Sequence, residues 1–191
     1  NAAAGEAALV AAMYAAQGYI VVAPNYAGFE ASTLSYHAFL NADQQSKDMI
    51  DALKAGRSAL PAIGNGTTDD GKLFITGYSL GGFVAMATHR ALQEAGETVT
   101  ASVGQSGPYA TSTLVDGLFG GTPYLGGTVF ATLAATSWQN AYGDIYTVPS
   151  DFYTSTYATG IDTLLPSTLP AADLFSSGKL PQLAVLGNDV A

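Results

Sequence analysis

The sequence contains no cysteine, so the chain can form neither a disulfide bond nor a thiolate metal site. Charged residues are also scarce: they make up 11% of the 191 residues, and Lys and Arg together number six against fifteen acidic residues. So few scattered cations cannot form the basic surface that nucleic acid or anionic lipid requires. No apolar run approaches the ~20 residues of a membrane-spanning helix. We therefore expect neither a nucleic-acid partner nor a membrane span.

The most informative stretch is the G-x-S-x-G motif at residues 77–81. Before it, the sequence KLFIT predicts a buried strand, and after it FVAMATHRAL predicts a helix. A strand, a sharp turn and a helix in this order are typical of a nucleophile elbow. A phosphate-binding turn would instead need the P-loop lysine or the G-x-G-x-x-G spacing.

Such a turn imposes strained backbone angles on its central residue, Ser79. We expect glycine at both Gly77 and Gly81 because a Cβ at either position would collide with its surroundings. The turn would lift the Ser79 hydroxyl out of the sheet. It would also aim the backbone N–H of Leu80, at the start of the helix, toward a developing oxyanion.

Strands and helices alternate through the first 105 residues, which predicts an α/β fold with a mostly parallel sheet covered by helices on both faces. The first helix should end at Gly18, and the second should be capped by Asn41 and ended by Pro61. Asp69 and Asp70 are predicted to form a solvated turn rather than a metal site. The predicted elements are a helix at 4–17, a buried strand at 19–24, a helix at 41–60, a buried strand at 72–76, the helix after the motif, and a buried strand at 98–105.

Residues 106–177 differ in character, because they contain no Lys or Arg and are rich in Gly, Thr, Ser and aromatic residues. We predict that residues 1–105 form the core, that residues 106–177 form a cap over the active site with a short helix at 130–138, and that residues 178–191 return to the core. The aromatic residues of the cap either line an acyl pocket or form the cap's own core. They are Tyr109, Phe119, Tyr124, Phe130, Trp138 and Tyr142.

A serine nucleophile needs a general base and a carboxylate that orients this base. His89 lies ten residues after Ser79 on the same predicted helix, roughly 15 Å along its axis, and is therefore too distant. His37 lies in a loop near the ligand-binding edge and could reach the pocket. No histidine follows residue 89. We therefore expect the catalytic His, and the Asp unless Asp189 serves, to lie outside this chain, which looks like the central part of a longer protein.

The motif with its flanking strand and helix resembles the α/β-hydrolase superfamily. Within it, the stretches YIVVAPNYAGFEAST and LFITGYSLGGFVAMATHRALQ resemble secreted bacterial esterases and lipases related to the fungal secretory lipases of the Candida antarctica lipase A type. The resemblance covers about residues 1–110. It implies that Ser79 is the acylated nucleophile and that the Leu80 N–H is one oxyanion donor. It also implies that further oxyanion residues lie upstream and that the catalytic Asp and His lie downstream.

Together these features predict a carboxylic-ester hydrolase that forms a Ser79 acyl-enzyme and prefers small to medium acyl esters. Tyr78 and Tyr109 are the candidates for substrate contact. No metal or organic cofactor is implied, and the expected partners are a small-molecule ester and the missing segments of the same protein. The weakly charged, acidic composition is typical of a secreted or periplasmic enzyme. The alternatives are a serine peptidase or amidase on the same fold and a non-catalytic binding module.

Overall fold

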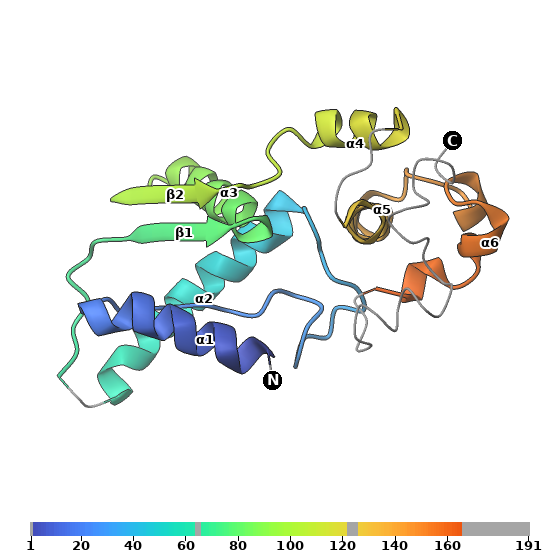
Figure 1. Cartoon of the computed structure of the whole chain (residues 1–191). Coiled ribbons are helices and arrows are strands. Elements are labelled where there is room, and N and C mark those ends of the chain that lie inside the picture. The colour runs from blue at the N-terminus through green and yellow to red at the C-terminus, as the bar shows by residue number, and fades with distance from the viewer. Residues whose placement is uncertain (1, 64–65, 122–125, 166–191) are drawn as a thin grey trace.

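The computed structural model describes residues 2–63, 66–121 and 126–165 of the chain. These residues form two lobes, the first made of residues 2–105 and the second of residues 127–165, and the helix at 111–119 lies beside the second lobe (Figure 1). The elements in chain order are α1 (Ala2–Met13), η1 (Ala15–Gln17), α2 (Ala42–Ile63), β1 (Phe74–Tyr78), α3 (Leu80–Glu94), β2 (Ala101–Gln105), α4 (Thr111–Phe119), α5 (Gly127–Tyr142), η2 (Pro149–Asp151), α6 (Ser155–Ala158) and η3 (Ile161–Thr163).

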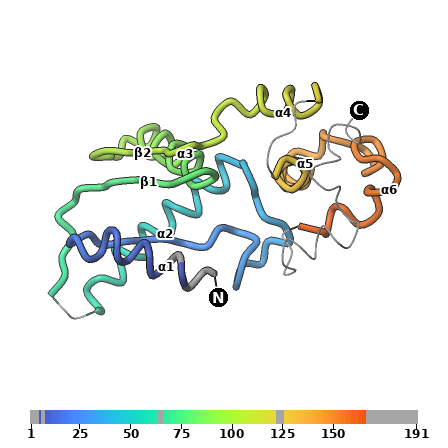
Figure 2. The backbone as a smooth tube through the Cα atoms, viewed as in Figure 1, coloured from blue at the N-terminus to red at the C-terminus, as the bar shows by residue number. Residues whose placement is uncertain are grey.

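In the described residues the sheet consists of β1 and β2, which pair in parallel from Phe74 opposite Ala101 to Tyr78 opposite Gln105. Helix α3 connects the two strands and packs against both of them and against α2. The path from α3 through β2 into α4 can be followed in Figure 2. The α/β alternation predicted around the motif is therefore confirmed.

The core of the first lobe lies between the sheet and its two helices. Ile75 of β1 and Ala85 and Leu92 of α3 are buried there, and each is at most 7% exposed. Half-buried apolar residues from α2 and from the ends of the strands, Ile50, Leu73 and Val99, pack against this cluster. Helix packing therefore fixes the direction in which β1 points its C-terminal end.

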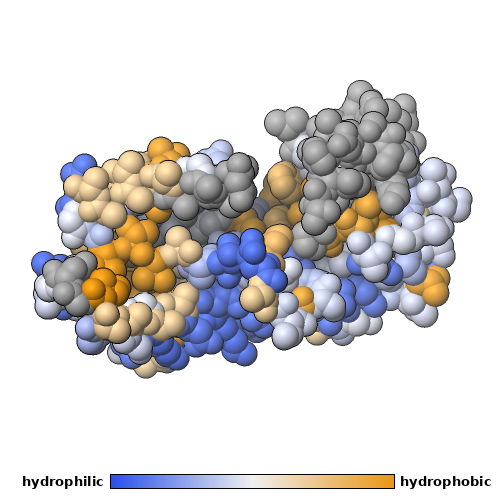
Figure 3. Space-filling view, turned by 90° about the horizontal axis from the view of Figure 1, so that it is seen from below, coloured by the Kyte–Doolittle hydropathy of each residue, from blue (hydrophilic) through white to orange (hydrophobic). Residues whose placement is uncertain are grey.

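The prediction that the strands are buried on both faces was wrong for the described residues. Phe74 of β1 is 49% exposed and Val103 of β2 is 54% exposed. The segment at 19–24 is extended but belongs to no strand, and Ile20 is 43% exposed. An apolar run favours burial, but burial also needs a layer over each face, and the described residues supply that layer on one face only. Apolar side chains accordingly appear at the surface in Figure 3.

The predicted signals at the ends of the helices were mostly confirmed. Gly18 follows the first helical segment with a φ of 91°, and Asn41 accepts a hydrogen bond on Oδ1 from the Gln44 N–H at 3.0 Å. Pro61 does not end α2, which continues to Ile63. A proline removes only its own N–H donor, so the residues after it can extend the final turn.

The turn before β1 has the contacts expected of a solvated loop. Asp69 accepts the Gly71 N–H at 2.8 Å and pairs with the Arg57 guanidinium at 2.8 Å. Asp70 accepts the Lys72 N–H at 3.0 Å. Both carboxylates are thus engaged by backbone and side-chain donors of the turn and of α2.

The second lobe is mainly helical, and its principal helix, α5, is longer than the predicted segment 130–138. Ile161 and Leu165 form its buried cluster, against which Val129, Leu133 and Tyr153 pack. The predicted boundaries of the cap, after residues 105 and 177, stay predictions. Residues 178–191, predicted to return to the core, lie outside the described residues. No helix in the described ranges has the length and hydropathy needed to cross a bilayer.

Two contacts connect the second lobe to the segment that precedes α2. The Trp138 indole N–H donates a hydrogen bond to the Leu40 carbonyl at 3.2 Å. The rings of Phe39 and Phe130 stack with a centroid separation of 6.0 Å and an interplanar angle of 6°. Helix α5 is therefore held beside the first lobe by residues 39 and 40.

We expect Asn41→Ala to lower the free energy of unfolding by about 1 kcal/mol, because it removes the side-chain cap of α2. Asn41→Asp should restore most of the loss, since a carboxylate also accepts the Gln44 N–H and favours a helix N-terminus. Thermal denaturation followed by circular dichroism measures both effects. Equal stability of the Ala variant and the unmodified protein would contradict the assigned cap.

Candidate active site

The turn between β1 and α3 consists of a single residue, Ser79, with a φ of 54° and a ψ of −122°. A positive φ is uncommon for any residue other than glycine and indicates backbone strain. The Ser79 N–H donates to the Gln105 carbonyl at 2.8 Å, and the Ser79 carbonyl accepts the N–H groups of Gly82 at 2.9 Å and Phe83 at 3.2 Å. The turn is therefore bonded to the end of β2 and to the first turn of α3, and the serine itself is exposed.

The glycines of the motif have unequal roles. A Cβ at Gly77 would lie 2.1 Å from the Gly81 carbonyl oxygen, so only glycine fits there. A Cβ at Gly81 would meet nothing within 4 Å. The expectation that a Cβ would collide at both positions was therefore wrong for Gly81. The second position at which a Cβ would collide is Gly82, where it would lie 2.7 Å from the Gln105 carbonyl oxygen. The close approach of α3 to β2, which motif spacing does not reveal, explains this requirement.

A cavity of about 460 Å³ opens beside Ser79. Its walls come from the start of α3, the loop after β2, helices α4 and α5, and the segment before α2. None of the described residues that line it carries a charge. They are Phe39, Leu40, Ser79, Leu80, Ser106, Gly107, Pro108, Thr111, Leu114, Val115, Leu118, Phe119, Phe130, Ala131, Ala134, Ala135, Trp138, Ile145 and Phe152.

The aromatic residues predicted for an acyl pocket divide into two groups. Phe119, Phe130 and Trp138 line the cavity, whereas Tyr109 and Tyr142 do not. Tyr124 lies outside the described residues. Most of the remaining apolar lining was missed, although the spacing of Leu114, Val115 and Leu118 on one face of α4 is a sequence signal that could have identified it.

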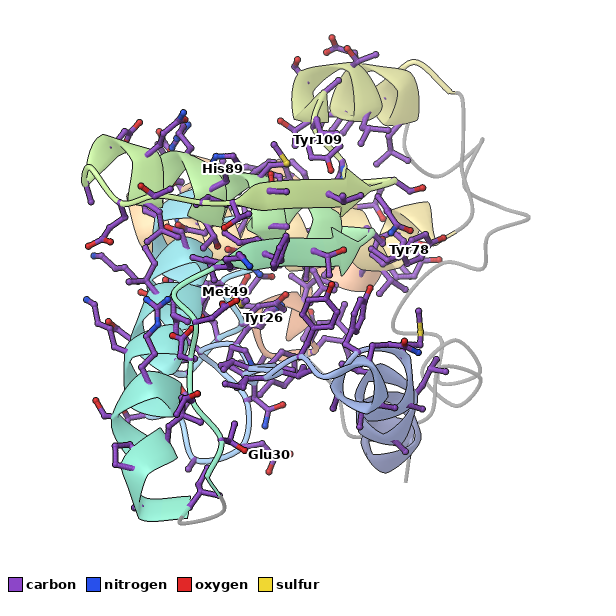
Figure 4. The ribbon with its side chains drawn as sticks, turned by 90° about the vertical axis from the view of Figure 1, so that its left-hand side faces the viewer. Tyr26, Glu30, Met49, Tyr78, His89 and Tyr109 are labelled. Carbon is purple, nitrogen blue, oxygen red and sulfur yellow. The ribbon has the colours of Figure 1, made fainter. Side chains whose placement is uncertain are left out.

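Neither tyrosine proposed for substrate contact lines the cavity. Tyr78 is 72% exposed at the end of β1, and Tyr109 lies between β2 and α4 (Figure 4). The Tyr109 ring fills a space left by three glycines. A Cβ on Gly82, Gly104 or Gly107 would lie 3.1 Å, 2.2 Å or 2.5 Å from its nearest Tyr109 atom. Tyr109 thus packs the loop after β2 against α3 instead of facing the cavity.

The two histidines contact other side chains and do not line the cavity. His37 is 5% exposed, its ring lies among Tyr26, Phe29 and Phe39, and its Nδ1 is 3.3 Å from the Ala27 carbonyl. Burial lowers the pKa of His37, so its ring is neutral at neutral pH. It lies outside the cavity lining, which removes the argument for His37 as the base.

His89 lies half-buried on α3, with its Nδ1 2.7 Å from the Ser102 hydroxyl. No histidine of the described residues therefore lines the cavity. Asp189, the candidate acid, lies outside the described residues. Within the described ranges there is also no group of three or more His, Cys, Asp or Glu residues placed to hold a metal ion.

The difference in space around Gly77 and Gly81 can be tested by alanine substitution. Gly77→Ala should prevent the turn from forming, because its Cβ would overlap the Gly81 carbonyl, and soluble folded protein should be lost or strongly destabilised. Gly81→Ala should leave thermal stability within a few degrees of the unmodified protein, since alanine also favours a helix over glycine. Equal damage from both substitutions would contradict the geometry of the turn.

Comparison with solved structures identifies proteins that match most of this chain. The cell wall degrading esterase LipA from Xanthomonas oryzae is 29% identical, with a TM-score of 0.73 over 84% of this chain and 43% of that chain. Its ligand-bound form matches at 28% identity with a TM-score of 0.74. A structure from Legionella pneumophila is 21% identical to this chain and has a TM-score of 0.77. The match covers 91% of this chain and 47% of that chain, and at this identity it supports the fold alone.

The chain spans less than half the length of these solved relatives. A search of curated proteins found no match. The likeness to fungal secretory lipases stays a prediction. The model of the prolyl oligopeptidase family matches residues 6–115, more than half of the chain. The strand, strained turn and helix at Ser79 lie within this match. The chain has the α/β-hydrolase fold and belongs to the prolyl oligopeptidase family.

Proposed function

We propose that the protein is a carboxylic-ester hydrolase in which Ser79 forms the acyl-enzyme. The observation that carries this proposal is the position of Ser79, which occupies a strained one-residue turn at the wall of an uncharged cavity. Strain of this kind persists only where the surroundings enforce it, and it is concentrated at functional sites. The likeness to LipA, whose name describes an esterase, supports ester chemistry.

In the proposed reaction the Ser79 Oγ attacks the ester carbonyl, and its proton passes to a general base. The tetrahedral oxyanion accepts a hydrogen bond from the Leu80 N–H, which begins α3 and has no carbonyl partner within the helix. Collapse of the intermediate breaks the ester bond and releases the alcohol, which takes the proton from the base. Water then attacks the acyl-enzyme, and the acid and Ser79 are released.

The base and its orienting carboxylate are proposed to come from segments beyond the described residues. The two histidines of the chain are engaged elsewhere, His37 in an aromatic cluster and His89 with Ser102. The second oxyanion donor is proposed to come from an upstream segment, whereas the base and its carboxylate are proposed to lie downstream. We propose no metal or organic cofactor, because each step needs only protein groups and water.

The cavity indicates the substrate. A volume of about 460 Å³ lies within the range of small-molecule sites and accommodates a small or medium acyl ester. The described lining residues are all uncharged, which favours an uncharged acyl group. The acidic, weakly charged composition and the likeness to a cell wall degrading esterase support a secreted or periplasmic location.

Membership in the prolyl oligopeptidase family favours a second function, hydrolysis of peptides or other amides by the same serine. The elbow alone does not distinguish the two, because the leaving group is recognised by the rest of the site. Comparing kcat/KM for an ester and an anilide of the same acyl group separates them. Preference for the anilide would favour the peptidase, and hydrolysis of neither would favour a non-catalytic binding module.

We expect Ser79→Ala in the full-length protein to reduce kcat for p-nitrophenyl butyrate by a factor of ~10³ or more, since loss of a catalytic serine removes the covalent pathway. Ser112→Ala is the matched control, because Ser112 is exposed on α4 and lies outside the cavity lining. It should retain full activity. An active Ser79→Ala variant would exclude the proposed mechanism.

A further inference from the structure

The face that α5 turns to the cavity consists of three alanines between two large aromatic residues. Ala131, Ala134 and Ala135 lie between Phe130 and Trp138, and all five line the cavity. Their spacing of one, three and four residues places them on one side of the helix. Ala134 and Ala135 are only 7% and 3% exposed, so this part of the wall is deep in the molecule.

The two aromatic residues are held in place by residues that precede α2. The Phe130 ring stacks on Phe39, and the Trp138 indole donates its hydrogen bond to the Leu40 carbonyl. Neither ring can swing across the alanines without losing its contact. The recess between them is therefore a lasting feature of the wall, and its depth is determined by the small size of the alanine side chains.

Across the cavity, α4 contributes Leu114, Val115 and Leu118, so the recess is apolar on both sides. Ser79 lies in the wall of the same cavity. An acyl group attached to Ser79 would find apolar surface along the recess, where the described lining residues offer no charged side chain. Apolar groups gain free energy from such burial in proportion to their area.

We propose that Ala131, Ala134 and Ala135 form the acyl-chain subsite and set the length of chain that the enzyme accepts. The preferred substrates are esters of unbranched, uncharged acids longer than acetate, whose chain lies along the recess between Phe130 and Trp138. This inference rests on the proposed ester hydrolysis. It adds the residues that determine specificity.

The test is the ratio of kcat/KM for p-nitrophenyl octanoate to that for p-nitrophenyl acetate in the full-length protein. Ala135→Leu fills the recess, so this ratio should fall at least ~10-fold, the usual scale for a steric change in an apolar pocket. Ala141→Leu is the matched control, since Ala141 is exposed on the same helix and lies outside the cavity lining. Its ratio should equal that of the unmodified protein.

Ala131→Leu, at a half-buried position of the same face, should lower the ratio in the same direction and serves if Ala135→Leu does not fold. A ratio within twofold of the unmodified value in a folded variant would overturn the assignment, as would an equal loss for both esters. Failure of the proposed function would look different, because the unmodified protein would hydrolyse neither ester. In that case, the affinity for octan-1-ol is measured by calorimetry. An affinity at least ~10-fold weaker in Ala135→Leu, but unchanged in Ala141→Leu, supports the subsite. Equal affinity in Ala135→Leu and the unmodified protein overturns it.

Discussion

The close approach of Gly77 to the Gly81 backbone is the constraint on which the rest of the site depends. A Cβ on Gly77 would lie 2.1 Å from the Gly81 carbonyl oxygen, and this close contact allows the chain to pass from β1 to α3 through Ser79 alone. The strained φ of Ser79 follows from that short connection, and hydrogen bonds to Gln105, Gly82 and Phe83 hold it. The strand, the helix and the opening of the cavity thus meet at one serine.

The sequence predicted the features that depend on local chemistry. The strand, turn and helix around Ser79, the Asn41 cap and the glycine at residue 18 each reflect a residue whose side chain, or lack of one, determines the nearby backbone. The α/β class followed from the alternation of these elements. Two local predictions were too simple. Pro61 lies inside α2 rather than at its end, and Gly81 has free space where a collision was expected.

Features that depend on contacts between distant segments could not be predicted from the sequence. The need for glycine at Gly82 arises from Gln105 on another strand, and the cavity wall combines Phe39 and Leu40 with residues of α4 and α5. Tyr109 was expected at the substrate but packs in a space formed by three glycines. The exposure of 19–24 likewise shows that hydrophobic pattern alone does not indicate which faces another layer covers.

The central claim is that Ser79 is the nucleophile, and the most direct test is covalent labelling of the full-length protein with a fluorophosphonate. Such reagents phosphonylate an activated serine and leave ordinary hydroxyls untouched, so the intact mass and a peptide map identify the reacting residue. We expect one adduct, located on Ser79, and a loss of ester hydrolysis in proportion to the fraction of protein labelled. An adduct on a different serine, or undiminished hydrolysis after complete labelling of Ser79, would contradict it.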